Sequence, residues 1–195
     1  MANADMTPKQ LIEEFIPKKL AELGDVTFPD LGVQFEVTIE GDGGGVWTIK
    51  TEGGKPRISA GGAKDPLVTV KTNRQAYDMG MKRAGGELDR DISGQVGNML
   101  KMVPDQTKVD MIRQQLSGTM MIKIATDEGD ALIGIGFVGP ADLVNPRCTI
   151  ETSEAELNEM RETRMPPQQA FMAGKIRLGG DMSLAMTAGM LLAPM

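Results

Sequence analysis

A passage from strand to helix occurs twice in this chain, and this repeat limits the folds available to it more than any other feature. The two copies read DPLVTVKTNRQAYDM, over residues 65–79, and NPRCTIETSEAELNE, over residues 145–159. A hairpin pattern precedes each copy, first VTIEGDGGGVWTI and later IKIATDEGDALIGI. Because self-similarity at a fixed spacing is the signature of duplicated structural units, we predict two related units, each with strands first and a helix afterwards.

The hydrophobic pattern within each unit favours strands in an antiparallel sheet, with helices between them. Val33, Phe35, Val37 and Ile39 alternate with polar residues, as in a strand that buries one face. Further strands are expected at 46–52, 55–62, 66–72, 119–125, 131–139, 146–152 and 174–178, and helices at 7–23, 73–83, 98–116, 153–162 and after Asp181. Residues 83–97 read as a loop or weak strand, and 165–178 as a turn leading into a strand.

The predicted fold class is therefore α+β, with a mixed, mainly antiparallel sheet covered by helices. We place unit one, the more degenerate, at residues 1–116 and unit two at 117–195, with a joint globule as the alternative.

Residue types that are missing from the chain remove several kinds of active site. There is no histidine, and Cys148 is the one cysteine, so a Ser-His-Asp triad, a Cys-His pair and a zinc cluster are all impossible. We expect a protein that is not an enzyme and that uses no metal and no cofactor. An enzyme acting on an apolar substrate would need Tyr77, Lys175 and a carboxylate to converge in one pocket.

The sequence GIGFVG, at residues 134–139, matches the glycine pattern of dinucleotide-binding loops. The residues that follow, PADLVNP, contain two prolines and cannot start the helix that such a site requires. We interpret the glycines as positions where the strand bends or passes close to another segment.

Charge and hydropathy indicate whether nucleic acid or a membrane is a partner of the chain. The net charge is −6 and no long basic run occurs, so no nucleic-acid partner is expected. No apolar run approaches the length of about 18 residues that spans a bilayer, and the start of the chain does not resemble a signal peptide. These features predict a cytoplasmic protein without stable membrane insertion, and leave transient membrane contact and a homodimer open.

Methionine is concentrated where each unit ends. Seven of the 16 methionines fall between Met79 and Met121, and seven more between Met160 and Met195. Because methionine is flexible and polarisable, such clusters are typical of surfaces that adapt to variable apolar ligands. Simple filling of a core is the alternative interpretation.

The stretch PPQQAFMAGKIRLGGDMSLAM, at residues 166–186, resembles the C-terminal signature of the sterol carrier protein 2 family. The matching residues are Pro167, Gln168, Ala170, Phe171, Gly174, Lys175, Ile176, Leu178, Gly180, Met182, Leu184, Ala185 and Met186. Upstream, CTIETSEAEL and VWTIKTEGGKPRIS resemble other passages of the family. The chain departs from the family pattern at Met172, Ala173, Asp181 and Ser183.

The resemblance implies an apolar tunnel between a sheet and its helices, and non-enzymatic binding or transfer of fatty acids, fatty acyl-CoA, sterols or similar apolar small molecules. An interaction or regulatory subunit of a larger enzyme assembly, without a ligand cavity, is the alternative. With Met182, Ala185, Met186 and Met190 on one helical face, we expect the last helix to close over the ligand. The predicted ligand-binding residues are Phe171, Met172, Ile176, Leu178, Met182, Ala185, Met186, Met190, Leu157 and Met160, with Phe35 and Trp47 in unit one.

Overall fold

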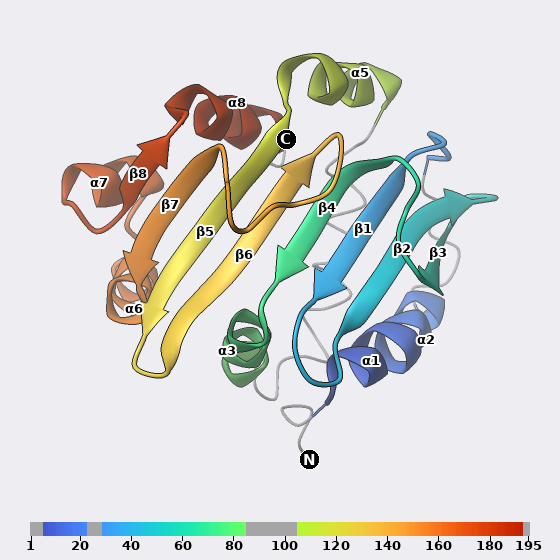
Figure 1. Ribbon diagram of the computed structural model, residues 1–195, viewed down its shortest axis with the longest axis horizontal. Helices are drawn as coiled ribbons and strands as arrows, with labels where there is room; N and C mark the ends of the chain where they lie inside the picture. Colours follow the sequence, from blue (N-terminus) through green and yellow to red (C-terminus); the bar gives the residue numbers. More distant parts are fainter. Residues whose placement is uncertain (1–5, 23–28, 85–104, 193–195) are drawn as a thin grey trace.

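A computed structural model describes residues 6–22, 29–84 and 105–192 of the chain (Figure 1). The strands are β1 (Gln34–Ile39), β2 (Gly45–Glu52), β3 (Lys55–Ala60), β4 (Pro66–Thr72), β5 (Gly118–Thr126), β6 (Gly129–Phe137), β7 (Cys148–Ser153) and β8 (Arg177–Gly180). The helices are α1 (Pro8–Gln10), the π-helical turn η2 (Leu11–Phe15), α2 (Ile16–Glu22), α3 (Arg74–Ala84), α5 (Gln106–Gln115), α6 (Glu154–Glu162), α7 (Pro167–Met172) and α8 (Met182–Leu192).

All eight strands form one continuous sheet in the order β3-β2-β1-β4-β6-β5-β7-β8. Strands β1 and β4 pair in parallel, as do β5 and β7, and the other neighbouring pairs are antiparallel. The predicted α+β class with a mainly antiparallel sheet is therefore confirmed.

The strand order contains the same arrangement twice. After hairpin β1–β2 and strand β3 the chain forms β4, which lies parallel to β1. After hairpin β5–β6 it forms β7, which lies parallel to β5. Helix α3 follows β4, and α6 follows β7. The two units meet where β4 pairs with β6, and no strand edge separates them there. This topology fits tandem units, while the boundary after residue 116 stays a prediction.

Equivalent caps begin the helices that follow β4 and β7. The Asn73 side chain accepts a hydrogen bond from the Ala76 backbone N–H at 2.9 Å, and that of Ser153 accepts one from the Glu156 N–H at 3.2 Å. Such caps satisfy backbone donors that have no partner inside the helix, which is why both helices start there. The Glu156 side chain accepts from the Ser153 N–H in return, so the two residues form a capping box.

The first helical segment is interrupted by a π-helical turn close to Pro17. Thr7 forms a capping box with Gln10, and Pro8 occupies the first turn. The π-helical turn η2 ends two residues before Pro17, and the Ile16 N–H donates to the Leu11 carbonyl across it. A wider turn at this point relieves the clash that a proline ring makes with the preceding turn.

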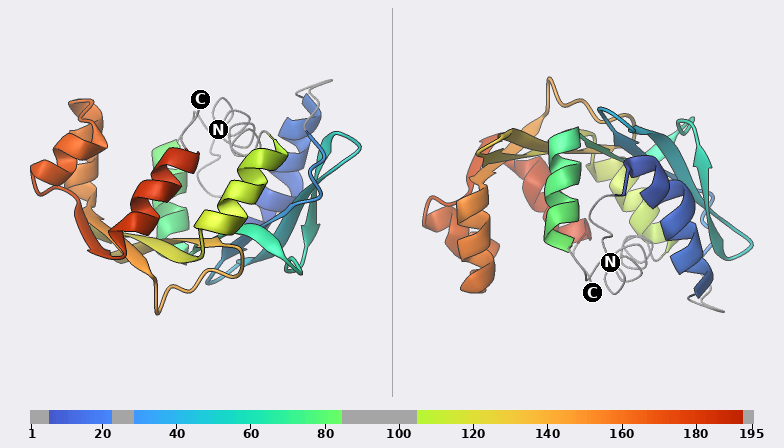
Figure 2. Two further views of the ribbon diagram at one scale, coloured as in Figure 1. Left: turned by 90° about the horizontal axis from the view of Figure 1, so that it is seen from above. Right: turned by 90° about the horizontal axis from the view of Figure 1, so that it is seen from below.

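The helices gather on one side of the sheet, and the β6–β7 loop crosses the other side (Figure 2). Two glycines of β6 permit this crossing. A Cβ atom on Gly136 would lie 2.8 Å from the Ala141 backbone nitrogen, and one on Gly134 would lie 2.5 Å from a Leu143 methyl carbon. The glycines of GIGFVG therefore serve close approach of a loop, as their context indicated.

Some details differ from the sequence-based expectations. The segment after the double proline forms the short helix α7 before the chain enters edge strand β8, instead of turning directly into a strand. Pro167 stands at the start of α7, where its missing N–H costs nothing. The expected loop or weak strand at 85–97, the first residues of the helix expected at 98–116 and the expected end of the first helix at Gly24 lie outside the described residues.

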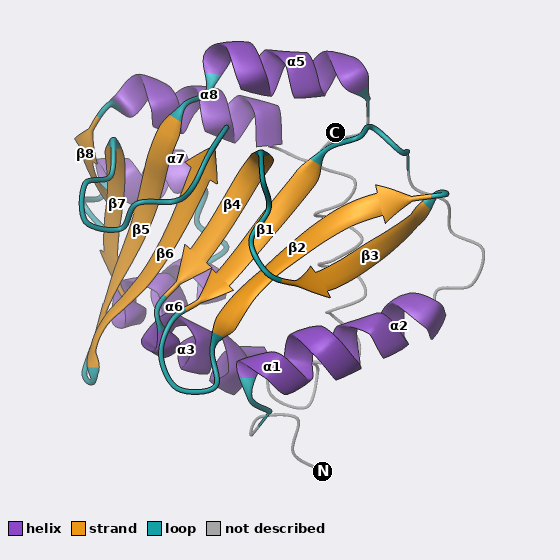
Figure 3. Ribbon diagram, turned by 45° about the vertical axis from the view of Figure 1, so that its right-hand side comes forward, coloured by secondary structure: helices purple, strands orange, loops and turns teal. Residues whose placement is uncertain are grey.

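Three clusters of buried side chains lie between the sheet and its helices. The largest is under α5 and α8 and includes Phe35, Phe137 and Leu184. A second, around Trp47 and Tyr77, lies under the N-terminal helices, which run past the β2–β3 end of the sheet (Figure 3). The third joins α3 to β5 and β6 through Met79, Ile124 and Ala131. None of the helices in the described ranges has the length and apolar character needed to cross a membrane.

Candidate functional site

The strand register brings aliphatic side chains from six strands together on the helix-covered face of the sheet. In one row Val37 lies opposite Val70, and Val70 lies opposite Ile135. In the next row Ile133 lies opposite Ile122, Ile122 opposite Ile150, and Ile150 opposite Leu178. Directly paired residues project from the same face, so these side chains are neighbours.

We call these seven residues the central strip: Val37, Val70, Ile122, Ile133, Ile135, Ile150 and Leu178. Every one of them is half-buried, whereas the same sheet face is buried at both ends of the strip. Phe35, Phe137 and Met120 are buried toward α5 and α8, and Ile124 and Ala131 are buried toward α3. The face is thus fully covered at its ends and partly open over its aliphatic middle. Apolar surface of this kind binds apolar partners.

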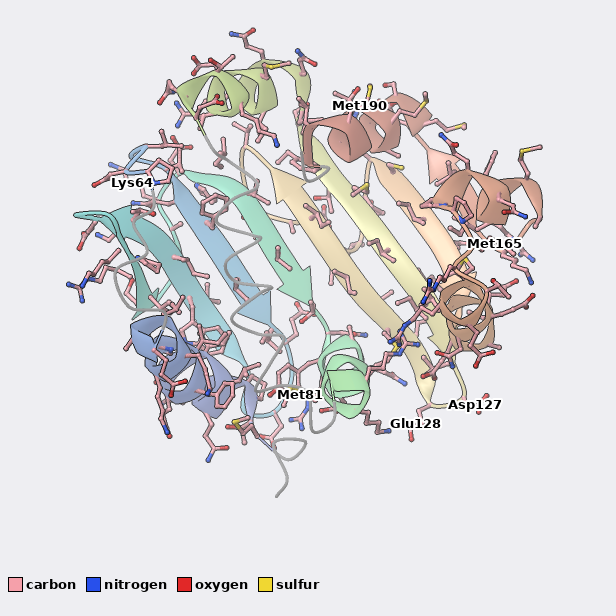
Figure 4. All side chains as sticks on the ribbon, turned by 180° about the vertical axis from the view of Figure 1, so that it is seen from behind. Lys64, Met81, Asp127, Glu128, Met165 and Met190 are labelled. Atoms are coloured by element: carbon pink, nitrogen blue, oxygen red, sulfur yellow. The ribbon has the colours of Figure 1, made fainter. Side chains whose placement is uncertain are left out.

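Helix α8 stands at the edge of the strip and presents two different faces. Leu184 and Ala188 are buried in the large core cluster, and Leu191 packs against that cluster. Met182, Met186 and Met190 recur every four residues on the opposite face and are 46, 64 and 71% exposed. Figure 4 shows Met190 at the outer side of α8. The methionine row therefore points away from the sheet, and α8 contacts the sheet through leucine and alanine.

The other predicted ligand-binding residues differ in burial and do not form one site. Leu178 belongs to the central strip, and Ile176, half-buried, comes just before β8. Phe35, Trp47 and Met160 are buried, while Leu157 packs from α6 against the cluster of Ile124 and Ala131. Phe171 and Met172 are exposed on α7, Met172 by 87%. Ala185 is half-buried against the large cluster.

Six strip residues besides Leu178 were not among the predicted site residues. Their strand alternation was visible in the sequence, but the alternation only identifies which residues share a face. Their convergence depends on the β4–β6 pairing, which joins the units and which no local pattern specifies.

Within the residues that the structure describes, groups suited to acid-base chemistry do not converge on the strip. The Tyr77 hydroxyl donates to the Met6 carbonyl at 2.7 Å, and burial raises the pKa of Tyr77 to about 12. The Lys175 ammonium pairs with Glu159 of α6 at 2.6 Å. This pair lies near edge strand β8, whereas Tyr77 is on α3. Cys148 is buried, and desolvation raises the pKa of its thiol, so the thiolate that nucleophilic chemistry needs is disfavoured.

A network of polar contacts holds the turn between β8 and α8. The Asp181 carboxylate accepts from the Ser183 hydroxyl and from the backbone N–H groups of Ser183 and Leu184 at the start of α8. Its second oxygen pairs with Arg147 at 2.7 Å, and Arg147 also donates to Ser117. These hydrogen bonds, that of Ser183 foremost, lower the pKa of Asp181 to about 2. The network fixes the angle at which α8 leaves the sheet.

A polar pocket of about 410 Å³ opens between α3, the β5–β6 turn and the start of α6. Figure 4 shows Asp127 and Glu128 on that turn, between α3 and α6. Met79 lines the pocket and also packs in the cluster that contacts Ile122 and Ile133 of the strip. Met79 and its cluster therefore lie between the pocket and these two strip residues.

The fold and the strip define an α+β protein with an aliphatic sheet face under a partial layer of helices. Residues 98–193, just under half of the chain, match the model of the SCP-2 sterol transfer family. The resemblance found in the C-terminal residues is confirmed. No curated protein sequence matches the chain.

Solved structures of sterol carrier proteins are similar to part of the chain. The crystal structure of sterol carrier protein 2 like 2 from Aedes aegypti is 19% identical, over 44% of this chain and 93% of that one, with a TM-score of 0.31. The sterol carrier protein domain 2 of Helicoverpa armigera is 20% identical, over 47% and 76%, with a TM-score of 0.32. Sterol carrier protein 2 from Yarrowia lipolytica is 18% identical, over 44% and 74%, with a TM-score of 0.30.

Proposed function

We propose that this chain binds lipids non-enzymatically, with the acyl chain or sterol-like body lying on the central strip. The observation that carries the proposal is the run of seven half-buried aliphatic side chains between two buried regions of one sheet face. The match of residues 98–193 to the model of a sterol transfer family supports the same class of ligand.

Burial of hydrocarbon supplies enough free energy for such a ligand. Each methylene moved from water to an apolar surface contributes about 0.8 kcal/mol. A chain of about a dozen carbons thus contributes roughly 10 kcal/mol before the entropic costs of binding are subtracted. No charged contact on the strip is required.

The direct test compares two substitutions that each introduce a phenylalanine, one on the strip face of the sheet and one on the opposite face. Ile135→Phe adds bulk to the strip, and Val46→Phe adds it to the exposed opposite face of β2. We expect Ile135→Phe to weaken binding of a fluorescent fatty acid analogue about tenfold, the equivalent of about 1.4 kcal/mol, and Val46→Phe to leave it unchanged. Thermal unfolding of both variants checks that each is folded.

Trp47, the one tryptophan of the chain, provides a second readout because it lies beside Val37 in the register of β1 and β2. Addition of palmitate to the unmodified chain should shift its emission. If no lipid copurifies in native mass spectrometry and fatty acids, acyl-CoA and sterols all fail to bind, the proposal is wrong.

An interaction subunit is the second candidate, and the methionine row of α8 favours it. Three exposed methionines on a helix without a charged residue form a surface that suits an apolar face of a partner protein. Under this alternative, replacing Met182, Met186 and Met190 by serine would release the chain from a larger assembly in sizing experiments, and Ile135→Phe would change nothing. A homodimer and transient membrane contact stay predictions.

A further inference from the structure

The exposed face of α8 combines large and small side chains. Met182, Met186 and Met190 form the methionine row, and Ser183 and Gly189 flank it on either side. All five residues are exposed. Apart from its chain neighbours and the helix backbone, nothing lies within 4 Å of where a Cβ atom on Gly189 would be. The face therefore has three flexible projections beside an open hollow, and a second face of the same shape can interlock with it.

This face carries no charge, and that property decides which partner fits it. The eleven residues of α8 include no charged side chain, although the whole chain has a net charge of −6. In a dimer with a two-fold axis, a residue on the axis meets its own copy, so a charge there would repel itself. A charge-free row avoids this repulsion, whereas a partner selected by its charge would find nothing on α8 to recognise.

The spacing of the row favours an antiparallel pair of helices. Met186 lies at the centre, four residues from Met182 and four from Met190. With a two-fold axis at Met186, Met182 of one protomer lies opposite the partner's Met190, next to the hollow at the partner's Gly189. Antiparallel packing also places the positive end of each helix dipole beside the negative end of the other.

We propose that the chain forms a weak homodimer in which the exposed faces of two α8 helices pack antiparallel about a two-fold axis at Met186. Eleven residues make a helix about 16 Å long, and one pair of such helices buries less than the roughly 1,200 Å² of a standard interface. The expected dissociation constant is therefore roughly 10–100 µM. The dimer does not depend on lipid binding, because the row points away from the sheet and its strip.

The first test uses the two-fold axis. Sedimentation velocity of the unmodified chain should show a monomer that becomes a dimer between about 5 and about 500 µM. Met186→Lys and Met186→Glu each place a charge against its own copy, so each should weaken association at least about tenfold. An equimolar mixture of the two variants should dimerise again, because opposite charges then meet at the axis. Thermal unfolding checks that both variants are folded.

A second pair of variants separates packing between protomers from packing within one. Gly189→Ala partly fills the hollow and should weaken association about threefold or more. It should also raise the unfolding temperature of the monomer, because alanine favours a helix over glycine. Gly80→Ala on α3, where the Cβ position is equally open, should raise the unfolding temperature and leave association unchanged.

Methionine oxidation gives a measurement at single residues. Hydrogen peroxide converts a thioether to a sulfoxide and is itself reduced to water, and exposed sulfurs react first. A higher concentration of the chain should slow the oxidation of Met182, Met186 and Met190, measured by mass spectrometry of peptides. Met172, which is 87% exposed on α7, is the internal control, and its oxidation rate should not change.

The outcomes separate this dimer from other uses of the row. A chain that stays monomeric up to about 500 µM overturns the proposal, as does a mixture of the two charged variants that fails to associate. If the chain instead floats with phosphatidylcholine vesicles and Met186→Lys prevents this, the row contacts a membrane surface and not a second copy. Ile135→Phe, which tests lipid binding on the strip, should leave association unchanged, so the two proposals fail independently.

Discussion

Single residues determine how closely the layers of this fold approach one another, and Gly136 is the clearest case. The β6–β7 loop lies on the sheet at that point, with three backbone atoms of residues 140 and 141 within 3 Å of where a Cβ atom would be. Backbone cannot move aside as a flexible side chain can. The glycine pattern that resembles a nucleotide-binding loop is therefore explained by the close approach of the β6–β7 loop to β6.

Replacing Gly136 by alanine should therefore destabilise the protein by about 1–3 kcal/mol, because the loop must shift off the strand. Gly80→Ala is the matched control: nothing lies within 4 Å of its Cβ position on α3, and alanine favours a helix by about 1 kcal/mol over glycine. Urea unfolding of both variants measures the two opposite changes. Equal stability of Gly136→Ala and the unmodified chain would show that the loop does not rest on β6 in solution.

At the scale of elements, the last helix shows how far the sequence can be interpreted. Its eleven residues, MSLAMTAGMLL, contain no charge and are apolar around most of the helix. In an amphipathic helix the apolar stripe identifies the buried face. In a helix that is apolar on most sides, the sequence does not identify that face. Both the methionine row and the leucine face were compatible with the pattern, and the structure places Leu184 and Ala188 against the sheet.

The two faces of α8 predict different costs of truncation. Leu184 is 3% exposed, so Leu184→Ala removes core packing and should cost about 2–4 kcal/mol. Met186 is 64% exposed, and Met186→Ala should change stability by less than about 0.5 kcal/mol. Chemical unfolding of both variants tests the assignment, and a large loss for Met186→Ala would mean that the methionine row is covered in solution.

Elements with strong local signals were predicted well, and their arrangement was not. The caps at Thr7, Asn73 and Ser153 and the alternation along β1 are chemistry among near neighbours in sequence, so they can be recognised without the fold. The central strip depends on pairing between residues far apart, such as Val70 with Ile135. Because every aliphatic strand could pair with several others, the site emerges only when the strand order is known.

At the scale of the whole molecule, two similar strand arrangements share one sheet, as tandem units would. Val70 and Ile150 occupy equivalent positions in the repeat, and both contribute to the strip. Strands β3 and β8 are the outermost strands of the sheet among the described residues, while β4 and β6 pair at the junction between halves. We infer that the first half is a degenerate copy whose remaining role includes completing the strip.

If the halves are joined in this way, they should unfold together. Each half holds one probe: Trp47, 2% exposed, reports on the first half through its fluorescence, and Cys148, fully buried, reports on the second through its reaction with a thiol reagent. Loss of the β4–β6 pairing would expose two sheet edges, so partial unfolding is unfavourable. We expect both probes to give the same midpoint in urea, with Cys148→Ala as the control that identifies the thiol signal. Thiol labelling that begins at clearly lower urea than the change in Trp47 emission would instead reveal two independent domains and place the lipid site within the second one.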